Sequence, residues 1–438
     1  MSQWDAPWLK ISGRVSEITP TGFAVNGLSR FARLGDCVSV ETSSGLVQGQ
    51  IIRIEKDKLL AKPFVSWADF HLGSKVWYGG RITIAPSAAW KGRAVNALGE
   101  PVDVAGELPC GTPVDPIAAK PPIPLHRKQI DAPVKTGISA IDLFTPICFG
   151  QRIGIFAGAG VGKSTLLMQL AMSSGFDQVV VCLVGERGRE VKLFHESTQL
   201  ASGKGLTSVI ATGDESPMMR RLAPYTATTI AEFFRDRGEA VLLIVDSLTR
   251  TAHAAREVAL SAGEPPVARG YPPSVLADLP QLLERVSAEE NQPGSITAIY
   301  SVLVDGDDQT EPVADCLRGT LDGHLNLSRT IAERGRFPAI DLLSSVSRLA
   351  SSALNEEQSR LVSLARALIA RYEDSFELRA MGAYQPGADP QLDLAIKLVP
   401  KIYELLTEGQ NEAEDADPFA ALDSLLSEAK ANPSQNTD

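Results

Sequence analysis

Short apolar runs separated by turn residues fill the N-terminal part of the chain. Between Ile11 and Ile84 the runs "ISGRVSEI", "GFAVNGL", "CVSVET" and "GQIIRIEKDKLLAKPF" carry β-branched residues at strand spacing. Alternation of apolar and polar residues indicates strands with one buried face. The pattern predicts a small β-barrel, and we place this first domain at residues 1–85.

The middle of the chain alternates between two kinds of segment. Apolar runs such as "QRIGIFAG", "QVVVCLVG", "AVLLIVDS" and "SITAIYSVLVDG" are separated by helical stretches such as "STLLMQLAMSS" and "TIAEFFRDRG". Continuous apolar strands between helices predict a parallel sheet that is covered on both faces. The stretch from "APSAAWKG" to "PPIPL" before them is rich in proline and glycine and is typical of a long ordered connector. We place this second domain at residues 86–348.

Beyond Arg348 the hydrophobic pattern becomes helical, in "EEQSRLVSLARALIARYEDSFELRAM" and "PQLDLAIKLVPKIYELLTEG". This pattern predicts a third, helical domain at residues 349–438. An acidic link, "NEAEDAD", precedes "PFAALDSLLSEA", whose apolar side chains fall on one helical face. Such a face either docks on its own domain, which we favour, or binds a partner. The side chains of this face are Phe419, Leu422, Leu425 and Leu426.

Composition and charge narrow the class of protein. A hydrophobic content of 44% over 438 residues is enough for a sizeable core and favours two or three domains. The net charge of −11 gives no electrostatic reason to expect a nucleic-acid or anionic-membrane binder. The 5 cysteines lack CxxC spacing, which argues against a disulfide framework or a zinc site and fits reducing cytoplasm. We find neither a signal-peptide pattern at "MSQWDAPWLK" nor an apolar stretch of the roughly 18 residues that a membrane span needs.

The stretch "FAGAGVGKSTLL" follows a predicted strand and opens a predicted helix. Its spacing fits a phosphate-binding P-loop with Ala157 in place of the first glycine, and this context argues against a chance match. The glycines let backbone N–H groups surround phosphate oxygens at the helix N-terminus. We expect Lys163 to reach the β- and γ-phosphates and Ser164 to coordinate Mg²⁺. The expected nucleotide-binding residues of the loop are Gly158, Ala159, Gly160, Val161, Gly162, Lys163, Ser164 and Thr165.

Two further apolar strands deliver charged residues to the same edge of the predicted sheet. The run "AVLLIVDSLTR" ends its strand at Asp246, as expected of a carboxylate in the Mg²⁺ shell. The run "VVVCLVGERGREV" delivers Glu186 and Arg187, because the C-terminal ends of parallel strands lie side by side. Glu186 is therefore a candidate to polarise the water that attacks the γ-phosphate. The alternative is a solvated glutamate paired with Arg187 or Arg189.

Five stretches together carry a family resemblance: "GRAVNALGEPVD", "TGISAIDLFTPICFGQRIGIFAGAGVGKSTLL", "GERGREV", "GEPPVARGYPPSVLADLPQLLERV" and "PAIDLLSSVSR". The chain resembles the catalytic subunits of rotary ATP synthases and their relatives, most closely the flagellar protein-export ATPases, also called flagellum-specific ATP synthases. The resemblance covers nearly the whole chain. It implies a Mg-dependent ATPase with an α/β P-loop NTPase core and a parallel sheet. A small N-terminal β-barrel would precede this core and a C-terminal helical domain would follow it.

The resemblance also implies roles for single residues. Glu186 would be the catalytic carboxylate, Asp246 the acid of the metal shell and Arg187 an arginine of the phosphate site. Arg348, the arginine of "SVSR", is similar to an arginine finger presented across a subunit boundary to the neighbour's nucleotide. A guanidinium there neutralises charge on the transferring phosphoryl group. The alternative is an arginine that pairs with an aspartate of its own domain.

Three aromatic residues are candidates for the adenine side of the site. Phe337, which precedes Pro338, matches a family position that stacks on the base. Tyr384 and Phe376 are further candidates. Each of these side chains also fits a place in the core.

Several classes of relative fit parts of the pattern. A Rho-type nucleic-acid motor would share the ring and the P-loop, but this chain is acidic and shows no basic, aromatic-rich RNA platform. A proton-driven synthase subunit fits less well, because "IARYEDSFELRAMGAYQPGADPQLDLAI" resembles the export ATPases. A non-catalytic subunit usually lacks the carboxylate present at Glu186. The ATPase of a virulence-type injection apparatus is the main alternative, because the two subfamilies share most of these sequence motifs.

The flagellar resemblance implies a function and a set of partners. ATP hydrolysis would energise the export of flagellar proteins through the flagellum-specific type III secretion apparatus, with ATP and Mg²⁺ bound. The chain would form a homo-oligomer, a hexameric ring, that contacts flagellar regulator and stalk proteins, the export gate, export chaperones and cargo. It would bind no nucleic acid. It would be cytoplasmic, held at the inner membrane of the flagellar base only through partners.

Overall fold

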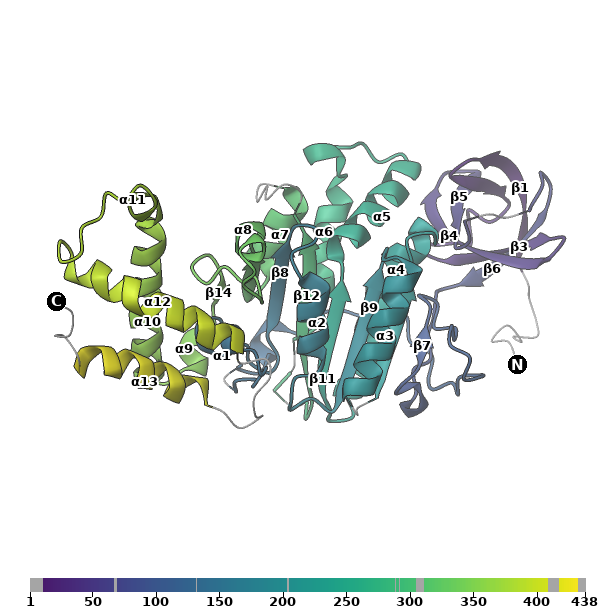
Figure 1. The fold of residues 1–438 in the computed structure, drawn as a ribbon. Helices are drawn as coiled ribbons and strands as arrows, with labels where there is room; N and C mark the ends of the chain where they lie inside the picture. The colour runs from purple at the N-terminus through teal and green to yellow at the C-terminus, as the bar shows by residue number, and fades with distance from the viewer. Residues whose placement is uncertain are drawn as a thin grey trace.

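In the computed structural model, the described residues are 11–66, 69–130, 132–202, 205–287, 289–290, 292–304, 311–408 and 417–431. Three parts lie in a row: a barrel, a sheet flanked by helices, and a group of helices (Figure 1). This arrangement confirms the fold class expected from the sequence. Within the part of the chain that the structure describes, no helix combines the length and apolarity that a membrane crossing requires.

The N-terminal part is a closed barrel in which the strands follow the order β1-β2-β5-β4-β3-β6. Alternate apolar side chains, such as Val38 and Val40 on one strand, point into its interior and are fully buried. Closure leaves no strand edge free along the ring of pairings. The strands are β1 (Ser12–Thr19), β2 (Gly22–Asn26), β3 (Cys37–Thr42), β4 (Gly45–Ile54), β5 (Lys58–Pro63) and β6 (Lys75–Gly80).

The central part is an 8-stranded sheet in the order β14-β13-β8-β12-β11-β9-β10-β7. All neighbours pair in parallel except β13 and β14. The strand β7 lies within the predicted connector and adds to the sheet beside β10, a pairing that the aperiodic sequence there does not indicate. The strands are β7 (Ala94–Val95), β8 (Arg152–Ala157), β9 (Gln178–Val184), β10 (Leu206–Ala211), β11 (Ala240–Asp246), β12 (Ser295–Leu303), β13 (Gly323–Leu327) and β14 (Val346–Ser347).

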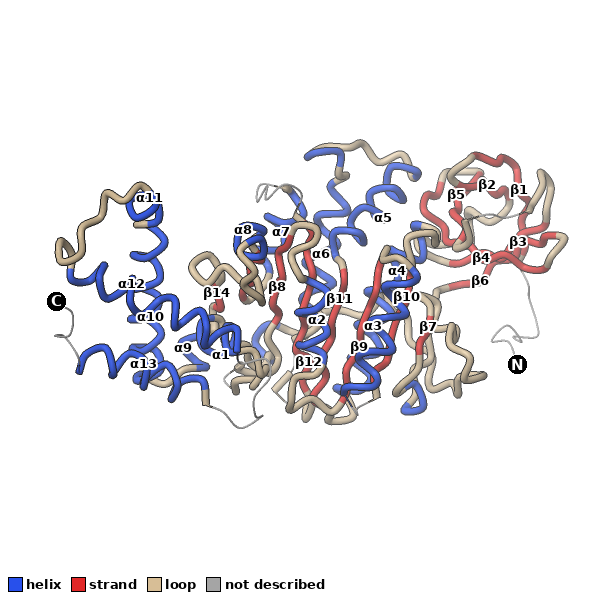
Figure 2. The backbone as a smooth tube through the Cα atoms, viewed as in Figure 1, coloured by secondary structure: helices blue, strands red, loops and turns tan. Residues whose placement is uncertain are grey.

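Helices cover both faces of this sheet (Figure 2). Successive residues of β9 separate into two cores, since Val180 and Cys182 pack with α4 to α7 while Val179 and Val181 pack with α1 to α3. A strand buried on both faces needs apolar residues at every position, which is why these strands read as continuous apolar runs. The helices are α1 (Ser139–Phe144), α2 (Lys163–Ala171), α3 (Gly188–Ser202), α4 (Pro217–Arg235), α5 (Leu248–Ser261), α6 (Pro273–Glu284), α7 (Pro312–Thr320) and α8 (Arg329–Glu333), with short 3-10 turns at Ala88–Trp90, Pro124–His126 and Ala268–Gly270.

The C-terminal part is helical, and its core is continuous with that of α1 to α3. The last helix, α13, packs against α10, α12 and α1. Leu422 and Leu426 of α13 are buried, so the predicted docking of this face on its own domain is confirmed. The acidic link before α13 lies largely outside the described residues. The helices are α9 (Ala350–Ala353), α10 (Glu356–Asp374), α11 (Phe376–Ala380), α12 (Pro390–Glu408) and α13 (Pro418–Ala431).

Candidate nucleotide site

The P-loop lies between the last residue of β8, Ala157, and the first residue of α2, Lys163. Gly160 and Gly162 have φ angles of +79° and +90°, a region that glycine adopts without a steric penalty. A Cβ added at Gly162 would also lie 3.4 Å from the ring of Phe337. The loop therefore turns directly into the N-terminus of α2, where free N–H groups and the helix dipole favour a phosphate.

Lys163 and Asp246 form an ion pair across the phosphate edge of the sheet. The Lys163 Nζ donates to Asp246 Oδ1 at 2.5 Å. Both side chains are largely buried, with exposed fractions of 11% and 4%. The P-loop lysine and the strand-end carboxylate, which are separated by 83 positions in the sequence, thus meet as the strand pattern predicted.

Glu186 lies two residues beyond β9 and joins the same group of charges. Arg250 Nε lies 3.2 Å from Glu186 Oε1, and Arg250 Nη1 donates to the carbonyl of Gly185 at 2.8 Å. Burial, and then the negative charge of Asp246, raise the pKa of the Glu186 carboxyl, while Lys163 and Arg250 oppose that shift. The raised pKa and the partly buried position suit a carboxylate that accepts a proton from water near neutral pH.

Arg250 is a residue of this site that the sequence analysis did not single out. It lies on the first turn of α5, which begins at Leu248 just after the end of β11. The sequence did contain a feature that points to Arg250. It follows Asp246 by four positions at the start of a helix, so the first helical turn keeps it close to the end of β11. The partner of Glu186 is therefore Arg250, and Arg187 instead forms an ion pair with Glu190 at 3.1 Å and is exposed.

Ser164 and Asp246 fit the donors that a Mg²⁺ ion requires. Ser164 is exposed on the first turn of α2, directly after the lysine that contacts Asp246. Mg²⁺ in nucleotide sites is held by one or two protein oxygens together with phosphate oxygens and water. Thr165, which follows Ser164, is also exposed and is therefore accessible to a bound phosphate.

Phe337 lines a pocket beside the P-loop, and Tyr384 lies elsewhere. The pocket has a volume of about 180 Å³ and includes Gly162, Thr165 and Pro338. Phe337 is 43% exposed, so part of the residue is accessible to a stacking partner. Tyr384 lies between α11 and α12, where its hydroxyl donates to Asp393 Oδ1 at 2.7 Å. The structure thus brings Phe337, and not Tyr384, to the P-loop.

Arg348 lies near the N-terminal ends of the parallel strands, whereas Lys163 lies beyond their C-terminal ends. Ser347 pairs with Gly323, and Gly323 pairs with Ile153 near the start of β8, whereas the P-loop follows the end of that strand. The four residue steps from Ile153 to Ala157 span about 13 Å. The exposed Arg348 guanidinium donates to the carbonyl of Arg318 at 3.2 Å, and among the described residues no carboxylate pairs with it.

The family models matched by this chain cover its second and third parts. Residues 137–347 match the ATP synthase alpha/beta family, nucleotide-binding domain. Residues 354–423 match the T3SS EscN ATPase C-terminal domain. The first match contains the P-loop, Glu186, Asp246 and Phe337, so every side chain of the phosphate edge described above falls within it.

Curated relatives and solved structures match nearly the whole chain. A flagellum-specific ATP synthase of Agrobacterium fabrum is 49% identical over 94% of this chain and 88% of that relative. A type 3 secretion system ATPase of Xanthomonas euvesicatoria is 42% identical over 90% of this chain and 89% of its own length. The assembled ATPase EscN of enteropathogenic E. coli superimposes with a TM-score of 0.86 at 37% identity, covering 95% of this chain and 99% of EscN. EscN in complex with its central stalk EscO gives a TM-score of 0.83.

Proposed function

The chain belongs to the ATP synthase alpha/beta family, and we propose that it hydrolyses ATP to energise the export of flagellar proteins through a flagellum-specific type III secretion apparatus. Several relatives that span nearly the whole chain, from Agrobacterium fabrum, Rhizobium meliloti and Caulobacter vibrioides, carry the name flagellum-specific ATP synthase. The observation that carries the ATPase activity is the convergence of Lys163, Asp246 and Glu186 at the phosphate edge.

The roles of these residues follow from their surroundings. Lys163 exchanges Asp246 for the β- and γ-phosphate oxygens, which replaces one anionic partner by another at little electrostatic cost. Ser164, and Asp246 through the metal's water shell, would hold Mg²⁺, which would supply positive charge to the phosphate oxygens. Glu186 accepts a hydrogen bond from the attacking water and orients it. Arg250 places its guanidinium on the carboxylate and so opposes the rise in the pKa of Glu186.

Arg348 acts on the neighbouring subunit's nucleotide in this proposal. Its place at the edge opposite to its own P-loop supports a role in trans, and its exposed guanidinium is free to meet a second chain. A planar guanidinium can then offset charge on the transferring phosphoryl oxygens. Arg187 contributes to the same phosphate site from the N-terminus of α3, after leaving Glu190.

The adenine binds on the Phe337 side of the P-loop. The pocket beside Gly162 and Thr165 supports this assignment for Phe337. Tyr384 would reach the base only through a movement of the segment between α11 and α12, because its hydroxyl is bound to Asp393. A Tyr384→Phe variant, which keeps the ring and loses this hydrogen bond, tests its part in nucleotide affinity.

The domain division that we propose is residues 1–85, 86–348 and 349–438, with the barrel joining subunits into a hexameric ring. EscN forms an assembled ATPase and a complex with its central stalk EscO, which supports oligomers and stalk proteins for this chain as well. For this chain we propose regulator and stalk proteins, the export gate, chaperones and cargo as partners. We place it in the cytoplasm, at the inner face of the membrane below the flagellum.

The physiological part of the proposal is tested in a strain that lacks this gene. We expect loss of flagellin export and motility, with both restored by the wild-type chain and neither restored by Glu186→Gln. Normal flagellation together with failed injection into host cells would instead assign the chain to a virulence-type secretion system.

The trans role of Arg348 is tested by mixing two inactive proteins. Arg348→Ala keeps an intact P-loop, and Lys163→Ala keeps an intact finger, so some interfaces of a mixed ring contain both. Partial ATPase activity on mixing is the expected result. Titration of each variant into wild type reveals strict coupling around the ring, which would hide the rescue. No rescue, with wild-type activity falling only in proportion to dilution, would make Arg348 a structural arginine of its own subunit.

A further inference from the structure

The backbone of Arg348 is held firmly while its side chain is exposed. The Arg348 backbone N–H donates to the carbonyl of Asp322 at 2.9 Å. The strand that carries the finger, β14, has only 2 residues and pairs with Gly323 and His324 of β13. So short a ladder gives little resistance to sliding, and other contacts must fix the register of this strand.

Gln151, the residue before β8, supplies such contacts. Its side chain is completely buried. Its Nε2 donates to Ser347 Oγ at 3.0 Å and to the carbonyl of Asp322 at 3.4 Å, while its Oε1 accepts from the N–H of Cys148 at 2.8 Å. One amide group therefore touches both the residue that precedes Arg348 and the carbonyl that holds the Arg348 backbone.

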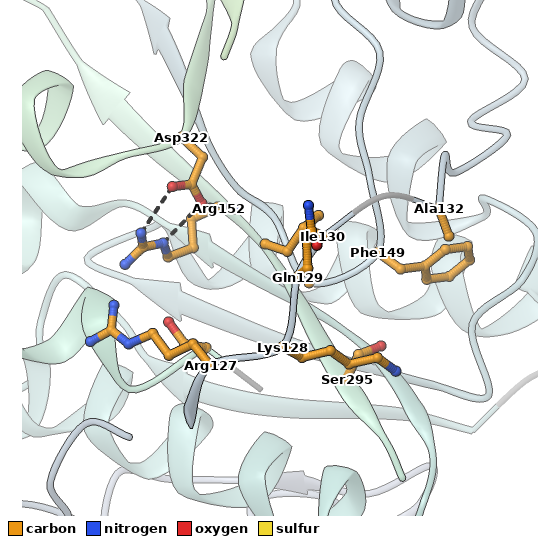
Figure 3. Close-up of a pocket in the computed structure, with 11 residues that line it drawn as sticks. Arg127, Lys128, Gln129, Ile130, Ala132, Phe149, Arg152, Ser295 and Asp322 are labelled. Atoms are coloured by element: carbon orange, nitrogen blue, oxygen red, sulfur yellow. Dashed lines mark hydrogen bonds and ion pairs between the residues drawn. The ribbon is translucent and has the colours of Figure 1, made fainter. Parts of the chain in front are cut away.

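Arg152, the next residue, holds the side chain of Asp322. Its backbone N–H and its Nε donate to Asp322 Oδ2 at 3.0 Å, and its Nη2 donates to Oδ1 at 2.9 Å. Figure 3 shows the Arg152 guanidinium turned toward the Asp322 carboxylate, with both side-chain hydrogen bonds drawn. The Arg152 Nη1 lies 2.7 Å from Glu284 Oε1, so a second carboxylate fixes the guanidinium from behind. A partly buried bidentate pair of this kind sets distance and orientation together.

We propose that Gln151 and Arg152 are positioning residues that set Arg348 for the neighbour's nucleotide. This inference rests on the proposed trans role of Arg348. Gln151 donates hydrogen bonds to the carbonyl of Asp322 and to the hydroxyl of Ser347, and Arg152 donates to the carboxylate of Asp322. The start of β8 thus fixes the finger given to one nucleotide, and the end of β8 begins the P-loop that binds another. One strand serves two sites.

We call the contacts of Gln151 and Arg152 with Asp322 and Ser347 the clamp. Gln151→Met tests the clamp, because methionine keeps the length of the side chain and removes its hydrogen bonds. A misplacement of 1 Å in a catalytic group costs up to about 10²-fold in rate. We therefore expect kcat to fall by about 10-fold or more, while nucleotide affinity stays within about twofold because the P-loop is intact. Ser347→Ala, which removes one acceptor, should lower kcat in the same direction by less.

The matched control is Gln178→Met. Gln178 is also completely buried and also begins a strand of the same sheet, where its Nε2 donates to Thr207 Oγ1 at 2.9 Å. Gln178→Met loses the two hydrogen bonds donated by Nε2, against three hydrogen bonds in Gln151→Met, and Gln178 lies away from β14. At equal fractions of folded protein, measured by thermal unfolding, Gln178→Met should keep kcat within about twofold. Equal losses of kcat in the two variants would reduce the clamp to a general effect of stability.

The mixing assay distinguishes two roles of the altered chain: it either supplies Arg348 to a neighbour's nucleotide or binds the nucleotide that a neighbour's Arg348 contacts. Lys163→Ala with Gln151→Met, mixed with Arg348→Ala, tests the altered chain as a finger donor. Arg348→Ala with Gln151→Met, mixed with Lys163→Ala, tests it as an acceptor. We expect the donor mixture to lose most of the rescued activity and the acceptor mixture to keep it. Equal loss in both mixtures, or none in the donor mixture, overturns the clamp. Absence of rescue in the parent mixture, after the titration into wild type, overturns the trans finger itself.

Discussion

The two ends of β8 hold their functional groups in opposite ways. At the end that leads into the P-loop, side chains hold one another, as Lys163 does Asp246. At the start of the strand, the side chains of Gln151 and Arg152 fix the segments around Arg348, and the Arg348 guanidinium is left exposed with a carbonyl as its partner.

This difference follows from where the ligand comes from. At the phosphate end the ligand is small and enters a site made by one chain, so Lys163 needs only to change partners. At the finger end the ligand belongs to another subunit, and no group of the same chain can hold the guanidinium in its working position. The backbone must then be fixed in advance, which lowers the entropy lost when the interface closes.

The largest effect that separates the two ends is expected from Arg348→Ala. We expect kcat to fall by about 10³-fold, in line with the loss of an arginine finger, while ATP still binds because Lys163 is untouched. Arg348→Lys keeps the charge without the planar fork and should recover only part of the rate. Steady-state kinetics and nucleotide titration measure both quantities. Arg360→Ala, which removes an exposed arginine of α10, is the control, and a matching loss of ATP affinity in Arg348→Ala would place this residue in its own site.

The next effect distinguishes the roles of two residues at the P-loop end of β8. Glu186→Gln should bind ATP and hydrolyse it about 10²-fold more slowly, because a general base acts mainly in the transition state. Lys163→Ala should lose nucleotide affinity by about 10-fold or more, since it removes a charge-assisted contact made in the ground state. Normal turnover by Glu186→Gln would remove this residue from the catalytic role.

A smaller effect should appear in the wild-type protein without any mutation. If the finger end serves another chain, ATPase activity per subunit must rise with protein concentration as rings form. We expect activity per subunit to rise by about 10-fold while light scattering shows the oligomer fraction rising from about a tenth to nearly all of the protein, because chains outside a ring lack the finger contribution. A flat specific activity across that transition would mean that one chain contains the complete site.

Local patterns predicted much of the fold. Apolar runs buried on both faces marked the parallel strands, and the face of Phe419, Leu422 and Leu425 marked α13. The P-loop and the two strand-end carboxylates were also predicted, because parallel strands bring their C-terminal ends together whatever the order of the strands.

Contacts between distant segments could not be predicted in the same way. The pairing of β7 with β10, and that of β14 with β13, depend on backbone hydrogen bonds that leave no period in the sequence. The place of Arg348 at the far edge of the sheet follows from the second of these pairings. The hydrogen bond from Gln151 to Ser347 joins residues 196 positions apart, so no local pattern marks it.

The smallest expected effect is a shift in the pH dependence of kcat, produced by Arg250→Met. Arg250 opposes the raised pKa of Glu186, so removal of its positive charge should raise that pKa further. A general base acts as the carboxylate, and activity is lost as the pH falls through its pKa; the acid limb of the kcat profile should therefore move to higher pH. Arg250→Lys keeps the charge and should leave the limb near its wild-type position. Gln151→Met, which acts at the other end of β8, should lower kcat at every pH without moving the limb. An unmoved limb in Arg250→Met would show that the ion pair at 3.2 Å does not set the ionisation of Glu186, and a moved limb in Gln151→Met would show that the two ends of the strand are not independent.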